Sequence, residues 1–125
     1  FEVGRFNLMD RLTNGHKMIS VNGEPIFAPV TKTRVAFTGF GRFGDELRME
    51  TFLKPQETTK LVFYYRVTQV NGGATVALGM TEHVTLTTAN RFLFKWPTDV
   101  QAQLKEFFRQ HPYVLTDGSA FDAKL

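Results

Sequence analysis

Apolar and polar residues alternate in several stretches of the chain, and this pattern predicts β-strands. The alternation is clearest over residues 74–88, where an apolar set, which we expect to face the core, is interleaved with threonines and His83. Residues 59–70 place apolar or aromatic side chains on both faces. Two more strands are expected over residues 30–38 and 46–54. Both are rich in β-branched and aromatic residues, and a glycine-rich corner separates them.

Helical spacing of apolar residues occurs near both ends of the chain. Phe1, Leu8 and Leu12 predict a helix over residues 1–13, and an apolar stripe after Pro97 predicts a second, over 98–108. The pair Asn22-Gly23 favours a short hairpin within residues 19–27. The last eight residues, GSAFDAKL, indicate a loosely held terminus.

One helix, a meander of about four strands and a terminal helix make the predicted fold class α+β. We expect a single domain over residues 1–110 and a C-terminal tail over 111–125. Apolar residues make up 42% of the chain and charged residues 22%, which is typical of a folded globular protein. Thirteen phenylalanines supply more aromatic area than a core of this size requires, so some are expected in an apolar pocket or a subunit interface.

Charge and cysteine content narrow the range of functions. The net charge is +3 and the Lys and Arg residues are scattered, which argues against a nucleic-acid-binding patch. There is no cysteine, hence no disulfide and no thiol nucleophile, and the three histidines share no element. We therefore expect no metal and no cofactor. No long apolar run and no leader are found, so no membrane association and a cytoplasmic location are expected.

Three stretches and the N-terminal helix resemble segments of a known family and occur in the same order along the chain as in that family. They are GRFGDELRMET at 41–51, FYYRV at 63–67, GMTEHVTL at 79–86, and residues 1–12, which look like the second half of a central helix. Together they resemble the 4-hydroxybenzoyl-CoA thioesterase-like branch of the hotdog superfamily, over residues 1–108.

The resemblance implies a hotdog fold, in which a curved antiparallel sheet wraps around a central helix. It also implies an acyl-CoA or acyl-carrier thioesterase that forms a homodimer or homotetramer with its apolar cleft at the dimer interface. In this branch a loop of the type Asp-x-Asp-x-x-Gly-His supplies the catalytic carboxylate ahead of the helix. The first strand, this loop and the start of the helix are thus expected upstream of Phe1.

The helix offers candidate site residues within the chain. Glu2, Phe6 and Met9 share one side of the helix, so Glu2 is a candidate catalytic carboxylate next to an apolar cleft. Alternatively, Glu2 is solvated or pairs with Arg5. Further candidates for substrate binding are Arg5, Phe6, Met9, Arg42 and His83.

The charged and polar residues in strands and turns can also have purely structural roles. For His83 the alternative to substrate binding is a half-exposed histidine of the sheet. Glu82 falls within the apolar set, so we expect either a bulge near Gly79 or a cation partner such as Arg66. Asp45 is expected to cap the turn at Gly44.

Thioester hydrolysis is therefore the first functional hypothesis. The alternative is a non-catalytic hotdog module that binds an acyl thioester or a partner protein. A dehydratase or hydratase ranks last, because such chemistry needs a histidine and an acidic residue at one site, and the helix carries no histidine on its candidate face.

Overall fold

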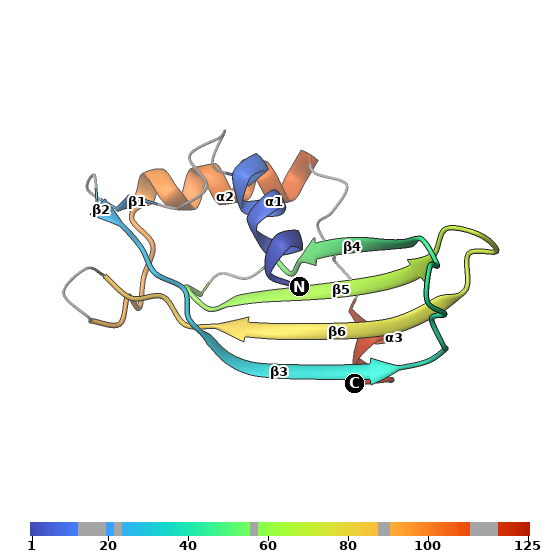
Figure 1. Cartoon of the computed structure of the whole chain (residues 1–125). Coiled ribbons are helices and arrows are strands. Elements are labelled where there is room, and N and C mark those ends of the chain that lie inside the picture. Colours follow the sequence, from blue (N-terminus) through green and yellow to red (C-terminus); the bar gives the residue numbers. More distant parts are fainter. Residues whose placement is uncertain (13–19, 22–23, 56–57, 88–90, 111–117) are drawn as a thin grey trace.

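The computed structural model describes residues 1–12, 20–21, 24–55, 58–87, 91–110 and 118–125. Its centre is an antiparallel sheet of four strands in the order β3-β6-β5-β4 (Figure 1). The strands are β3 (Val30–Phe37), β4 (Leu47–Leu53), β5 (Leu61–Gln69) and β6 (Thr75–His83). The helices are α1 (Glu2–Leu12), α2 (Thr98–Gln110) and α3 (Ser119–Asp122).

All four predicted strands and both predicted helices are present. The predicted hairpin is also confirmed, since β1 (Ser20–Val21) pairs with β2 (Glu24–Pro25), although its turn at Asn22-Gly23 lies outside the described residues. Strand β6 stops at His83 instead of reaching residue 88. Beyond it, Leu86 forms only single bridges to Phe27 and Phe92.

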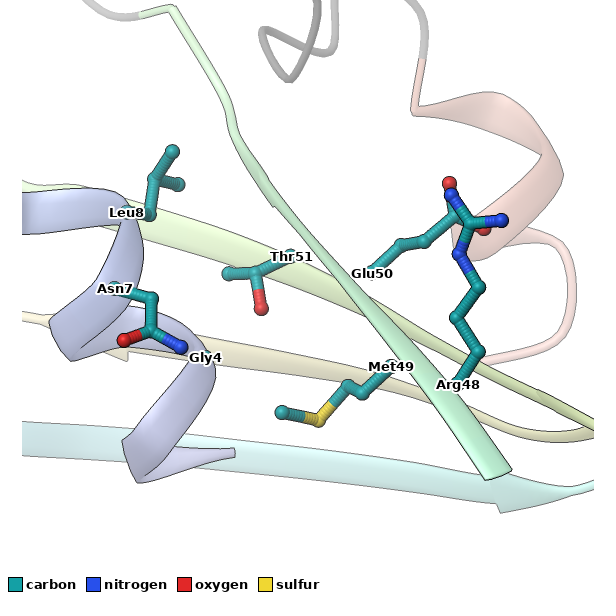
Figure 2. A pocket seen from close by; sticks show the side chains of 7 residues that line it. All are labelled: Gly4, Asn7, Leu8, Arg48, Met49, Glu50 and Thr51. Carbon is teal, nitrogen blue, oxygen red and sulfur yellow. The ribbon is translucent and has the colours of Figure 1, made fainter. Parts of the chain in front are cut away.

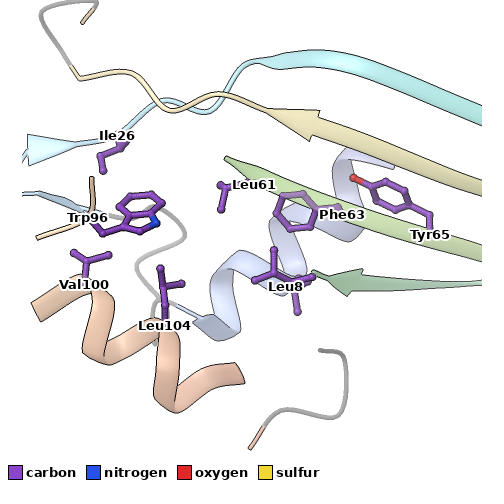
Figure 3. Packing of buried hydrophobic residues seen from close by; sticks show 9 residues of the cluster. Leu8, Ile26, Leu61, Phe63, Tyr65, Trp96, Val100 and Leu104 are labelled. Atoms are coloured by element: carbon purple, nitrogen blue, oxygen red, sulfur yellow. The ribbon is translucent and has the colours of Figure 1, made fainter. Parts of the chain in front are cut away.

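The first half of strand β5, from Leu61 to Tyr65, is buried on both faces. Leu61, Phe63 and Tyr65 point to the side of α1 and α2 and join a cluster there with Leu8 and Leu104 (Figure 3). Val62 and Tyr64 point to the opposite face of the sheet. The strand therefore separates an inner cluster, on the α1 side, from an outer cluster, on the α3 side.

The orientation of β6 differs from the sequence prediction. Its apolar residues Leu78 and Met80 belong to the outer cluster, away from α1. Thr81 and His83 alternate with them and therefore lie on the α1 side, where both are only 2% exposed. The prediction took polarity as a sign of exposure, but these polar groups are buried because they satisfy one another by hydrogen bonds.

The C-terminal segment covers the outer cluster and is not loosely held over its described part, 118–125. Phe121 of α3 is 5% exposed and packs against Tyr64 and Phe52, with ring centroids 5.1 and 5.9 Å apart. The Tyr64 hydroxyl donates to Asp122 Oδ1 at 3.0 Å. One aromatic anchor therefore fixes a segment whose polar composition suggested a tail.

Two local predictions concern charged residues near turns and strands. The turn at Gly44, whose φ is +88°, is capped as predicted, because Arg42 N–H donates to Asp45 Oδ2 at 2.7 Å. Glu82 does pair with a cation, but the partner is Lys60 at 3.0 Å and not Arg66, which binds Glu50 instead. The strand pairing is irregular at two places, between Val30 and Lys32 of β3 and between Val67 and Thr68 of β5, which lie opposite Ala77 and Thr75. Gly79 itself pairs in register with its neighbours on both sides.

Candidate functional site

The inner face of the sheet holds an apolar pocket of about 160 Å³ between α1 and the ends of β5 and β6. We call it the α1 pocket. Most of its walls are aromatic or aliphatic, and the polar groups are few. The lining residues are Arg5, Phe6, Met9, Ile26, Phe27, Ala28, Leu61, Phe63, His83, Thr85 and Trp96. An apolar cavity with a few convergent polar groups is typical of a small-molecule site.

The pocket brings together four of the six site residues proposed from the sequence: Arg5, Phe6, Met9 and His83. Arg42 does not join them. It lies in the corner after the end of β3 at Phe37, whereas the pocket lies where β3 begins and β6 ends.

Glu2 does not line the α1 pocket and its side chain is exposed. It is in the first turn of α1, three and four residues before Arg5 and Phe6. Residues at these spacings are neighbours on a helix surface. Glu2 therefore lies on the same side of α1 as Arg5 and Phe6, outside the walls of the pocket.

A chain of hydrogen bonds crosses the sheet beside the pocket. Arg5 Nη1 donates to the Tyr65 hydroxyl at 3.2 Å, and that hydroxyl lies 2.6 Å from Thr81 Oγ1. Thr81 Oγ1 lies 2.9 Å from His83 Nε2, and His83 Nδ1 lies 2.8 Å from the Ala28 carbonyl oxygen. Tyr65 is fully buried, so the chain runs through the interior of the protein.

The donors in this chain follow from its two ends. The Ala28 carbonyl only accepts, so His83 Nδ1 carries a hydrogen and donates it. In neutral imidazole Nε2 then accepts, and it accepts from the Thr81 hydroxyl. Thr81 has no second hydrogen, so its oxygen accepts from Tyr65, whose own oxygen accepts from Arg5. Every hydrogen bond thus points from Arg5 toward Ala28.

The electrostatics agree with a neutral His83. Burial is the main cause that lowers the pKa of His83; the hydrogen bond to the Ala28 carbonyl partly opposes it, and the positive charge of Arg5 lowers the pKa by a lesser amount. Burial also raises the pKa of Tyr65, which the hydrogen bond and the positive charge of Arg5 partly offset. Both nitrogens of His83 are occupied, so the ring stabilises the pocket and leaves no lone pair for a substrate.

Arg5 is the one permanently charged side chain among the described residues that line the pocket. The bond to Tyr65 uses one of its five N–H groups and fixes the guanidinium at the pocket. The other N–H groups suit a carbonyl oxygen or an anion. None of the described lining residues carries a carboxylate, so a general base has to come from outside these walls.

A second hollow lies between α1 and β4 (Figure 2). Thr51 and Met49 point toward α1, while Arg48 and Glu50 leave β4 on the other side. Gly4 makes this close contact possible, because a Cβ there would overlap Thr51 Oγ1 and approach the Met49 methyl group to 2.7 Å. Its charged lining residues, Arg48 and Glu50, point away from α1 and out of the hollow, so we do not regard it as the reactive site.

Within the described ranges, no three histidine or carboxylate side chains lie close enough to hold a metal ion. His16 and His111 lie outside those ranges. No described helix has both the length and the apolar character needed to cross a bilayer.

Some residues of the site were missed from the sequence. No periodicity marks Trp96, because it follows an irregular segment. The alternation pattern predicts Tyr65 and Thr81 only as strand residues. A usable signal existed: Thr81 and His83 are two apart, so they share a face and can hydrogen bond along one strand.

The strand order and the helix packed on the inner face define the hotdog fold. No protein-family model matches the sequence, and no curated protein matches it either. Solved structures do share the fold. The hypothetical protein TT1821 from Thermus thermophilus has a TM-score of 0.66 and 25% identity, over 84% of this chain and 77% of that one.

Two solved structures with a stated activity are also similar in fold. Slr0204, a 1,4-dihydroxy-2-naphthoyl-CoA thioesterase from Synechocystis, gives a TM-score of 0.56 at 17% identity, over 70% of this chain and 62% of that one. The 12:0-ACP thioesterase from Umbellularia californica gives 0.69 at 14% identity, over 90% of this chain. The match spans only 42% of that second protein.

Proposed function

We propose that this protein hydrolyses acyl thioesters of coenzyme A or of an acyl carrier, with the acyl group in the α1 pocket. The observation that carries the proposal is the pocket itself, an apolar cavity with a fixed guanidinium at α1, in a fold shared with CoA and ACP thioesterases. The apolar walls suit the acyl group, and the Arg5 guanidinium suits the thioester carbonyl.

In this mechanism Arg5 stabilises the negative charge that develops on the carbonyl oxygen. Glu2, on the same side of α1, removes a proton from water, and the resulting hydroxide attacks the carbonyl carbon. The C–S bond then breaks, the sulfur takes up the proton, and the products are a carboxylic acid and a free thiol. Tyr65 acts through Arg5, by holding the guanidinium in place.

The test is release of free thiol from a panel of short, long and aromatic acyl-CoAs. Glu2→Gln is expected to lower kcat by about 10²–10⁴, the usual contribution of a general base. Glu106→Gln is the matched control, because Glu106 is also an exposed helical glutamate but lies on α2 and pairs with Arg109. Hydrolysis absent from the whole panel, or equal losses in both variants, would refute the proposal.

A non-catalytic acyl-binding module is the second candidate. It is favoured by one observation, the lack of a carboxylate among the described residues that line the pocket. Binding of an acyl-CoA without release of thiol, unchanged by Glu2→Gln, would support this function over the first.

We also propose that two copies join through β3 and that Arg42 contacts the thioester carrier. Strand β3 is an edge of the sheet and is exposed along almost its whole length, with Val35 43% and Phe37 82% exposed. An exposed apolar edge strand tends to pair with another chain. Sedimentation should give a dimer or tetramer at micromolar concentration, and Val35→Glu should shift it to monomer. A wild-type monomer would contradict this assembly.

A further inference from the structure

Trp96 lies between two cavities. On one side it lines the α1 pocket, and on the other it lines a cavity of about 600 Å³ beside α2, which we call the α2 cavity. The α2 cavity has apolar walls from Leu104 and Phe108 and two exposed lysines, Lys95 and Lys105. Among the described lining residues, Trp96 alone belongs to both cavities.

The indole of Trp96 is a fixed wall. Trp96 is 3% exposed and packs in the inner cluster between Ile26, Leu61 and helix α2 (Figure 3). Its Nε1–H donates to the Thr58 carbonyl oxygen at 3.2 Å, and its own carbonyl accepts from Gln101 Nε2 at 3.1 Å. Rotating the indole away would break this part-buried hydrogen bond and the packing of a nearly fully buried ring, so the indole is held as the wall.

We propose that Trp96 sets the size of the acyl group by closing the α1 pocket at its α2 end. This inference rests on the proposed acyl site. A dry cavity of about 150 Å³ holds one benzene-sized ligand, so the α1 pocket suits a single ring or a short chain. A chain of about a dozen carbons needs the α2 cavity, from which the indole separates it.

Replacing the indole should therefore connect the cavities and change the preferred acyl length. We would measure binding of benzoate, hexanoate and dodecanoate by titration calorimetry. The wild type should bind the two small acids at least ten times more tightly than dodecanoate. In Trp96→Ala, dodecanoate should gain more than the whole wild-type gap and become the best ligand, since each buried methylene adds about fourfold in affinity.

Leu104→Ala is the matched control. Leu104 is also buried, at 4% exposure, and lines the α2 cavity but not the α1 pocket. This variant enlarges the cavity and leaves the indole in place, so it should keep the wild-type ranking of ligands. Trp96→Phe, the milder change, should shift the ranking in the same direction and guards against a variant that fails to fold.

The outcome separates this inference from the proposed function, because free acids are bound and not hydrolysed. A switch in ranking without any thioesterase activity would support the role of Trp96 and refute the hydrolase. Hydrolysis with an unchanged ranking in both Trp96 variants would refute the role of Trp96 alone. Failure of the wild type and of Trp96→Ala to bind any of the acids would also overturn it.

Discussion

The hydrogen-bond chain beside the α1 pocket makes Thr81→Val the sharpest test of the structure. Valine has nearly the shape of threonine, so the substitution leaves no cavity and removes only the hydroxyl. The hydroxyl of fully buried Tyr65 loses its acceptor, and Nε2 of His83 loses its donor. Two buried polar groups are thus affected by one substitution.

The expected loss of stability follows from these two groups. Each buried polar group without a partner costs about 1–3 kcal/mol. Tyr65 keeps the hydrogen bond from Arg5, so its share lies near the lower limit. We expect Thr81→Val to lower the free energy of unfolding by about 2–4 kcal/mol. This is a large part of the about 5–15 kcal/mol that stabilises a typical domain.

Urea unfolding followed by circular dichroism measures this loss. The control is Thr31→Val, because Thr31 is exposed and donates one hydrogen bond to the Glu82 carbonyl. It should change stability by less than about 0.5 kcal/mol. Adding Tyr65→Phe to Thr81→Val removes the hydroxyl that has lost its acceptor. The double variant should therefore lose less unfolding free energy than the two single variants lose together. A loss below about 1 kcal/mol, or strict additivity, would refute the directed chain.

Three further predictions follow from charge and packing. The pKa of His83 lies below its usual value of 6.5, so the unfolded chain binds this proton more tightly and stability should fall as the pH drops below about 6.5. The slope due to His83 is at most about 1.4 kcal/mol per pH unit and should vanish in His83→Gln, compared by urea unfolding between about pH 7.5 and 5. Gly4→Ala should destabilise by about 1–3 kcal/mol in thermal unfolding, since the new methyl overlaps Thr51; a gain from helix propensity would show that α1 packs elsewhere. A double-mutant cycle on Glu50 and Arg66, which bond at 2.9 Å across β4 and β5, should give a coupling below about 1 kcal/mol that decreases with salt, because the guanidinium is 41% exposed.

The sequence predicted the elements of the fold well, since period-two alternation and helical stripes are local properties. It failed where burial depends on partners distant in the chain. The polar face of β6 became interior because Tyr65 and Arg5, from two other elements, satisfy Thr81 and His83. The local pattern can pair Thr81 with His83 along one strand, but it does not show that Tyr65 and Arg5 complete the network.

The site was predicted in part for the same reason. Helical spacing placed Glu2, Phe6 and Met9 on one side of α1, and the structure brings Phe6 and Met9, but not Glu2, into the walls of one pocket. Trp96 completes that pocket from a segment without periodicity, and Phe121 anchors a polar C-terminal segment by a single side chain. Isolated aromatic residues in irregular segments therefore deserve a place among candidate core residues, even where the surrounding sequence is polar.

Strand β5 lies between the two hydrophobic clusters of the interior. Its odd-numbered residues from Leu61 to Tyr65 belong to the cluster beside the pocket, and its even-numbered residues Val62 and Tyr64 belong to the cluster under α3. The two clusters share no member, so substitutions on opposite faces should add in free energy. The α3 face can therefore be redesigned, to carry a label or to raise thermal tolerance, while the ligand-facing side keeps its shape.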